Sequence, residues 1–102
     1  MRGISVQNLT PDLREQFGAP PNVKGVVIAE IDPNSPAAQQ GLQAGVIIQS
    51  INRQTVTSVA DFNRLAAGAK GEVLLRVFFQ GQGQFVVISP GDNGSDNGDD
   101  GN

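Results

Sequence analysis

Short apolar runs, each bounded by glycine, proline or polar residues, constrain the fold of this chain more than any other feature. Residues 25–31 are mostly apolar and rich in branched side chains, which predicts a buried β-strand. Residues 4–7 alternate apolar and polar side chains, which predicts a strand with one buried face. The same reasoning predicts further strands at 46–51, 54–56, 72–80 and 84–89, and the last two form a hairpin across residues 81–83.

Signals for the start of a helix lie between these strands. Thr10 before Pro11 and Ser35 before Pro36 each combine a capping side chain with a proline that suits the first helical position. They predict short helices within 9–18 and at 37–40, and Ser58 caps a longer one at 59–67. The chain is therefore expected to be α+β and mostly β: a five- to six-stranded antiparallel sandwich or partial barrel, capped by two to three short helices.

Composition excludes several classes of function. The chain contains no cysteine, histidine or tryptophan. A thiolate nucleophile, a zinc-thiolate site and a Ser-His-Asp triad therefore cannot be assembled from it. Outside the last twelve residues the carboxylates are not clustered either. We expect no catalytic constellation, no cofactor and no metal site.

The charge is divided unevenly along the chain. The formal net charge is −3, but four aspartates fall in residues 91–102, and residues 1–90 carry seven basic and six acidic groups. The folded part is thus nearly neutral and has no basic stripe, so nucleic acid is not an expected partner. The longest apolar runs are far shorter than a membrane span, so a membrane is not expected as a partner either.

Residues 91–102 contain no apolar side chain. Nothing there can offset the entropy of ordering, so we expect a folded domain at 1–90 and a disordered acidic tail at 91–102. Asn93, Ser95, Asn97 and Gly98 match part of a calcium-binding loop. The chain ends before the bidentate glutamate that such a loop requires, so we expect no calcium site.

Residues 2–8 carry the first functional signal. Gly3 can turn the backbone and expose amide groups, and an alternating strand follows it directly. Such a turn can form a nest for an anion, and a strand with a free edge can accept a strand from another molecule. An ordinary first strand of a small domain would have the same sequence, so both interpretations stay open on these residues alone.

A longer motif adds a family resemblance. Residues 35–45 read S-P-A-A-x-x-G-L-x-x-G, and an I-x-x-I-N strand follows at 48–52. With the turn at residue 3 and the helix after Ser58, this order resembles a PDZ domain. More narrowly, residues 2–90 resemble the permuted PDZ domain of HtrA/Deg-type (DegP-like) serine proteases, in which it follows the protease domain.

The resemblance implies a function. In such domains the C-terminus of a peptide adds a strand between the first strand and the long helix. The carboxylate loop would then comprise Arg2, Gly3, Ile4 and Ser5, and the groove would be lined by Val6, Phe62, Leu65 and Ala66. In the helix, either Phe62 or Leu65 forms the pocket wall, and the other belongs to the core.

The resemblance also implies a setting. The isolated domain would be non-catalytic, and a parent protease in the periplasm would use it for protein quality control. Its partners would be the C-termini of unfolded or substrate proteins.

Two departures from the family pattern suggest an alternative. The family usually has Gly-Asp-Val-Ile where this chain has residues 45–48, so Val46 replaces an aspartate expected at the surface. Phe78 and Phe79 are adjacent in a strand, so one of the two must face outward. Exposed apolar residues mark interfaces. Self-association, or an engineered contact surface, through Val46, Phe78 and Phe79 is therefore the second hypothesis.

Overall fold

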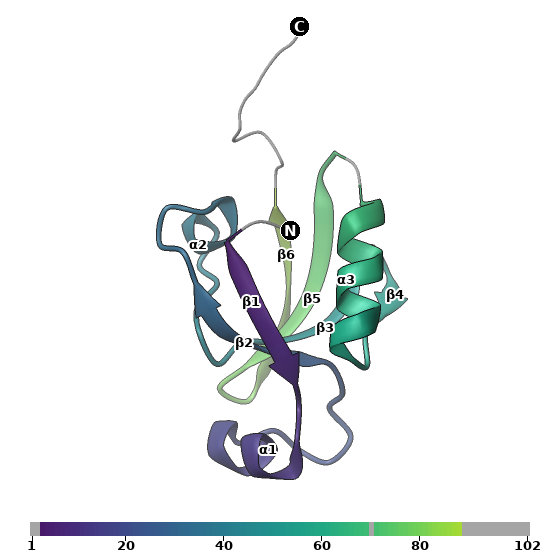
Figure 1. Ribbon diagram of the computed structural model, residues 1–102. Coiled ribbons are helices and arrows are strands. Elements are labelled where there is room, and N and C mark those ends of the chain that lie inside the picture. Colours follow the sequence, from purple (N-terminus) through teal and green to yellow (C-terminus); the bar gives the residue numbers. More distant parts are fainter. Residues whose placement is uncertain (1–2, 70, 89–102) are drawn as a thin grey trace, which may run out of the picture.

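The computed structural model describes residues 3–69 and 71–88 (Figure 1). Arg2 and the tail at 91–102, with its partial calcium motif, lie outside the described residues, so their predicted roles stay predictions. In chain order the elements are β1 (Ile4–Asn8), α1 (Pro11–Phe17), β2 (Val26–Ile31), α2 (Pro36–Gln39), β3 (Ile47–Ile51), β4 (Gln54–Thr55), α3 (Val59–Gly68), β5 (Val73–Phe79) and β6 (Gln82–Ile88).

The strands form one antiparallel sheet in the order β1-β2-β3-β5-β6, and β4 pairs with β3. The sheet is open, so β1 and β6 lie at its two ends. Figure 1 shows α3 beside β1, with α1 and α2 near opposite ends of that strand. The predicted fold class, an α+β and mostly β domain capped by short helices, is confirmed.

Both faces of the central strands are buried, which explains their continuous apolar sequences. Val26, Ile28 and Ile48 belong to the main core cluster, against which Val59, Leu65 and Ala66 of α3 pack. Val27 and Ile47 point to the opposite face, where Leu13 and Phe17 of α1 cover them. Alternate residues of β2 and β3 thus fill two separate cores, one under α3 and one under α1.

The three helices begin where their caps predict. Thr10, Ser35 and Ser58 each accept a hydrogen bond from the backbone N–H three residues later. Proline occupies the first turn of α1 and of α2. Among the described residues, no helix combines the length and the hydropathy needed to span a bilayer.

The final hairpin differs from its prediction. Its turn consists of Gln80 and Gly81, both with positive φ, and Phe79 already pairs with Gln82. Two consecutive left-handed residues form the tight turn that matches the twist of an antiparallel pair. The predicted three-residue turn at 81–83 is therefore wrong, because Gln80 adopts a conformation more usual for glycine or asparagine.

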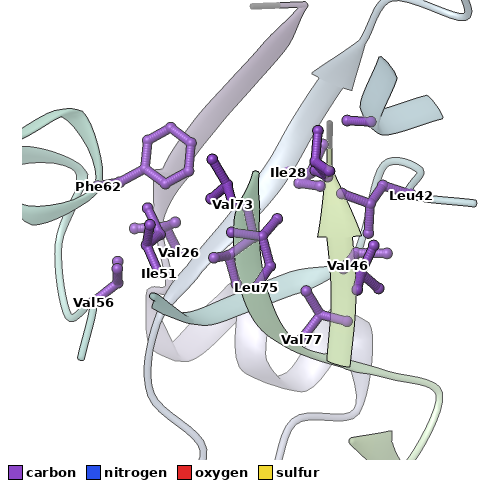
Figure 2. Close-up of a cluster of buried hydrophobic side chains, with 14 residues drawn as sticks. Val26, Ile28, Leu42, Val46, Ile51, Val56, Phe62, Val73, Leu75 and Val77 are labelled. Carbon is purple, nitrogen blue, oxygen red and sulfur yellow. The ribbon is translucent and has the colours of Figure 1, made fainter. Parts of the chain in front are cut away.

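The position of Val46 contradicts the hypothesis that it forms part of a self-association surface. Its side chain is 3% exposed and lies in the main core beside Leu42 (Figure 2). Residues 45 and 46 are hydrogen-bonded to both backbone groups of Ile28, at 2.9 and 2.8 Å, and this pairing holds residue 46 at the core. A self-association surface that includes Val46 is therefore wrong, because the side chain is not available to a partner.

The adjacent phenylalanines separate as strand geometry requires. Phe79 packs against the main core, and Phe78 packs against the smaller cluster on the other face. Both rings are half-buried. The pair therefore does not form one exposed aromatic patch.

Candidate functional site

β1 is an end strand whose side chains alternate as predicted. Ile4 and Val6 are half-buried against the main core, whereas Ser5 and Gln7 are exposed. Within the described part of the chain, β1 pairs only with β2. Its other edge therefore keeps backbone donors and acceptors that an added strand can use. A β-bulge between Ser5 and Val6 interrupts the pairing with β2.

The turn before β1 requires glycine for two independent reasons. Gly3 has φ of +81°, in the left-handed region that disfavours other residues. A Cβ at this position would lie 2.5 Å from the Cβ of Ser35. The Gly3 carbonyl also accepts a 2.7 Å hydrogen bond from the N–H of Asp32. The turn is thus pressed against the segment that leads into α2.

Ser35 holds that segment in place. Its side chain is buried, and its hydroxyl donates to the Asp32 carbonyl at 2.7 Å and accepts from the N–H of Ala38 at 3.2 Å. The carboxylate of Asp32 accepts from the N–H of Asn34 at 2.8 Å. Sequence reasoning identified Ser35 only as a helix cap. Its second role, as the surface behind the Gly3 turn, was missed because it depends on a contact between distant segments.

One side chain joins the end of β1 to the start of α3. The side-chain oxygen of Asn8, the last residue of β1, accepts a 2.9 Å hydrogen bond from the N–H of Val59, the first residue of α3. This bond satisfies one of the helix's unpaired N–H groups. It also fixes the start of the helix next to the end of the strand, as Figure 1 shows. Sequence reasoning did not identify Asn8.

The side chains of α3 fall into two groups. Phe62 is 3% exposed and projects from the helix toward the strands of the main core (Figure 2). Leu65 and Ala66 are half-buried against the same cluster that Ile4 and Val6 contact from β1. Phe62 is therefore a core residue. Leu65 and Ala66 remain accessible on the helix, as Ile4 and Val6 do on the strand.

The ends of β1 and β2 nearest the turn carry negative charge. An open depression of about 360 Å³ is lined by Gly3, Ile4, Ser5, Glu30, Ile31 and Asp32. Glu30 and Asp32 are the charged residues of this lining. An anion bound beside them would depend on backbone N–H groups for its stabilisation, because no lining side chain among the described residues is cationic.

Asp61 stabilises the beginning of α3. Its carboxylate accepts hydrogen bonds from the hydroxyl and the N–H of Thr57, at 2.8 and 3.1 Å, and its own N–H donates to the Ser58 hydroxyl. This arrangement is a variant of the capping box, in which the carboxylate bonds to the residue before the N-cap rather than to the N-cap itself. The bonds from Thr57, followed by the bond from Arg64, hold the pKa of Asp61 below its ordinary value of 3.8.

We expect the NMR titration midpoint of the Asp61 carboxyl to fall below 3.8. Because the folded-state pKa is lowered, the stabilisation is present above the unfolded pKa and is lost as pH falls through the folded one. Thr57→Val removes the hydroxyl donor and should raise the midpoint. A midpoint at or above 3.8 that does not respond to Thr57→Val would contradict the capping arrangement.

Comparison with known proteins identifies the family. The family model described as "PDZ domain" matches residues 27–78. The "Probable periplasmic serine endoprotease DegP-like" of Chlamydia pneumoniae is 38% identical over 89 residues, which is 86% of this chain and 18% of the relative. The protein of the same name in Halomonas elongata is 33% identical over 92 residues, which is 88% of this chain and 19% of the relative. The chain thus spans less than a fifth of these relatives.

Solved structures give the same result. The HtrA3 PDZ domain bound to a phage-derived ligand (FGRWV) has a TM-score of 0.74 and 25% identity, covering 89% of this chain and 84% of that one. The HtrA-type protease AlgW with a decapeptide has a TM-score of 0.73 and 28% identity, covering 87% of this chain and 28% of that one. The chain therefore belongs to the PDZ domain family, as a PDZ domain of the HtrA/DegP type.

Proposed function

We propose that this domain binds the C-terminus of a peptide as an added strand between β1 and α3. The observation that carries the proposal is the free edge of β1, next to half-buried apolar side chains of α3. Strand addition satisfies the edge's hydrogen-bonding groups, while pockets for alternate side chains supply specificity. The ligands named for the HtrA3 and AlgW structures, a phage-derived peptide and a decapeptide, support the same class of partner.

Each residue of the proposed groove has a separate role in peptide binding. The backbone N–H groups at Gly3, Ile4 and Ser5 face the terminal carboxylate, with Arg2 adding positive potential. Ile4 and Val6 from β1, with Leu65 and Ala66 from α3, surround the last side chain of the peptide. Phe62 supports this pocket from the core, where its ring holds α3 on the sheet.

The expected interaction free energies indicate that the domain binds peptides weakly. About four strand-pairing hydrogen bonds contribute roughly 0.5–1.5 kcal/mol each. Burial of one apolar side chain adds about 1.5–3 kcal/mol. Ordering of the peptide opposes both terms, so the expected affinity is on the order of micromolar. Glu30 and Asp32 beside the turn weaken the hold on a carboxylate further, because like charges repel.

The relatives suggest the setting in which this binding operates. They are named as periplasmic serine endoproteases, and this domain corresponds to less than a fifth of their length. The domain would then serve a periplasmic protease by capturing exposed C-termini of unfolded proteins. Peptide hydrolysis would occur in another domain of the parent, because this chain has neither histidine nor cysteine to build the triads of acyl-transfer enzymes.

Peptides that end in Val, Leu, Ile or Phe should bind as free acids and at least about tenfold more weakly as C-terminal amides. The reason is that an amide cannot present a charged carboxylate to the N–H groups of the Gly3 turn. Isothermal titration with acid and amide forms of one sequence measures this difference. Equal affinities would show that the carboxylate is not captured, leaving at most strand addition by internal segments.

A further inference from the structure

The solvated face of an antiparallel sheet is commonly polar, but the outer face of β5 and β6 carries exposed apolar side chains. Phe85 is 64% exposed and Val87 is 46% exposed. Across the strand pair, Val87 lies opposite Leu74 and Phe85 lies opposite Arg76. These side chains lie on the same face of the sheet as the smaller core cluster under α1, which includes Phe78 of β5, but Phe85 and Val87 stay exposed beyond it.

This face is hollowed and cationic. A depression of about 990 Å³ is lined by the apolar side chains of Leu74, Phe78 and Phe85 and by the cations Lys24, Arg53 and Arg76. Acidic residues are absent from its lining in the described part of the chain. We refer to these six residues as the outer-face site.

The cations of the outer-face site are not neutralised within the described structure. The single ion pair found in residues 3–69 and 71–88 joins Arg64 and Asp61 on α3. Arg76 instead lies with its guanidinium 6.0 Å from the centre of the Phe85 ring, at the outer limit of a cation–π contact. The site therefore offers an aromatic surface and three positive charges to a partner.

Charge and apolarity together select the partner. A second copy of the domain would bring like charges together across a symmetric contact. A nucleic acid would meet the cations and stack one base on Phe85, but Leu74 and the neighbouring Val87 offer no ring for a second base. The residues at 91–102 carry four aspartates but no apolar side chain to cover Phe85.

We propose that the outer-face site binds an acidic protein segment that carries apolar side chains between its carboxylates. The segment lies on β5 and β6 and extends to Lys24 and Arg53, and among the described residues none from β1 or α3 lines the depression. The site is therefore separate from the groove proposed for C-terminal peptides. One domain can then hold a peptide C-terminus and an acidic segment at the same time.

Titration of the ¹⁵N-labelled chain with a blocked peptide tests this. The probe is an acetylated and amidated octapeptide that alternates Asp or Glu with Leu or Phe, so that it offers no terminal carboxylate. We expect amide shifts at residues 74–78 and 83–87. Phe85→Thr and Arg76→Gln should each weaken binding by about tenfold, since aromatic and arginine anchors dominate interfaces. Arg64→Gln removes the same charge from α3 and should change nothing.

Several results would overturn the proposal. Shifts confined to β1 and α3, or affinities that Phe85→Thr and Arg76→Gln leave unchanged, would place the peptide elsewhere. Equal binding of polyglutamate or oligothymidylate would reduce the site to a non-specific polyanion contact. Shifts at 74–78 and 83–87 on dilution would indicate a second copy as the occupant. The same shifts on removal of residues 91–102 would indicate the chain's own acidic segment.

Discussion

Gly3→Ala is expected to destabilise the domain by about 3 kcal/mol and to weaken binding of C-terminal peptides by at least about tenfold. A left-handed backbone disfavours alanine by about 1–3 kcal/mol. The new methyl group would also lie 2.5 Å from the Cβ of Ser35, so the turn must move away from the segment that leads into α2. Movement of the turn displaces the N–H groups that we propose for the carboxylate.

Gly81→Ala provides a matched control. Gly81 has φ of +83°, nearly the value at Gly3, but a Cβ there meets no atom within 4 Å. Its substitution therefore measures the backbone term alone, and it should leave peptide affinity unchanged because the hairpin is remote from β1. Urea denaturation and peptide titration of both variants separate the effects. Equal stability losses, or full peptide affinity in Gly3→Ala, would contradict a turn packed tightly against Ser35.

Features that depend on neighbouring residues could be predicted from the sequence. The caps at Thr10, Ser35 and Ser58 are local, since each hydroxyl bonds to an N–H three residues away. The strands of the sheet could be located because branched residues and turn formers alternate along the chain. The two-residue turn at Gln80 could not be predicted, because nothing in the sequence indicates that a glutamine adopts the left-handed conformation.

Contacts between distant segments could not be predicted in the same way. Asn8 and Val59 are 51 positions apart, so nothing in either segment indicates that the strand caps the helix. Val46 was expected at the surface because the family pattern has an aspartate there. The hydrogen bonds of residues 45 and 46 with Ile28 place its side chain in the core instead. The sequence pattern was thus sufficient to predict the number of strands. The contacts that hold the candidate site in place could be identified only from the folded structure.

The orientation of helix α3 also could not be predicted fully from the sequence. The family resemblance placed Phe62, Leu65 and Ala66 along the groove, but it left open whether Phe62 or Leu65 faces the core. The structure buries Phe62 and leaves Leu65 half-buried. Stability and binding should therefore respond in opposite ways to changes at these two positions.

We expect Phe62→Ala to lower the free energy of unfolding by about 3–5 kcal/mol, because it removes a buried ring and leaves a cavity. Leu65→Ala should lower it by only about 1 kcal/mol, since that side chain is only partly buried. Peptide binding should show the reverse order. Leu65→Ala removes one wall of the proposed pocket and should weaken a hydrophobic C-terminal peptide by about tenfold.

Asn63→Ala is the control for the helix itself, because Asn63 is exposed on α3 and its replacement leaves the apolar face intact. Its stability and peptide affinity should stay close to those of the unmodified chain. Urea denaturation gives the unfolding free energies, and peptide titration in the folded baseline of each variant gives the affinities. If Phe62→Ala abolished binding with little loss of stability while Leu65→Ala unfolded the domain, the ring would belong to the pocket. The helix would then lie on the sheet in a register rotated from the one described.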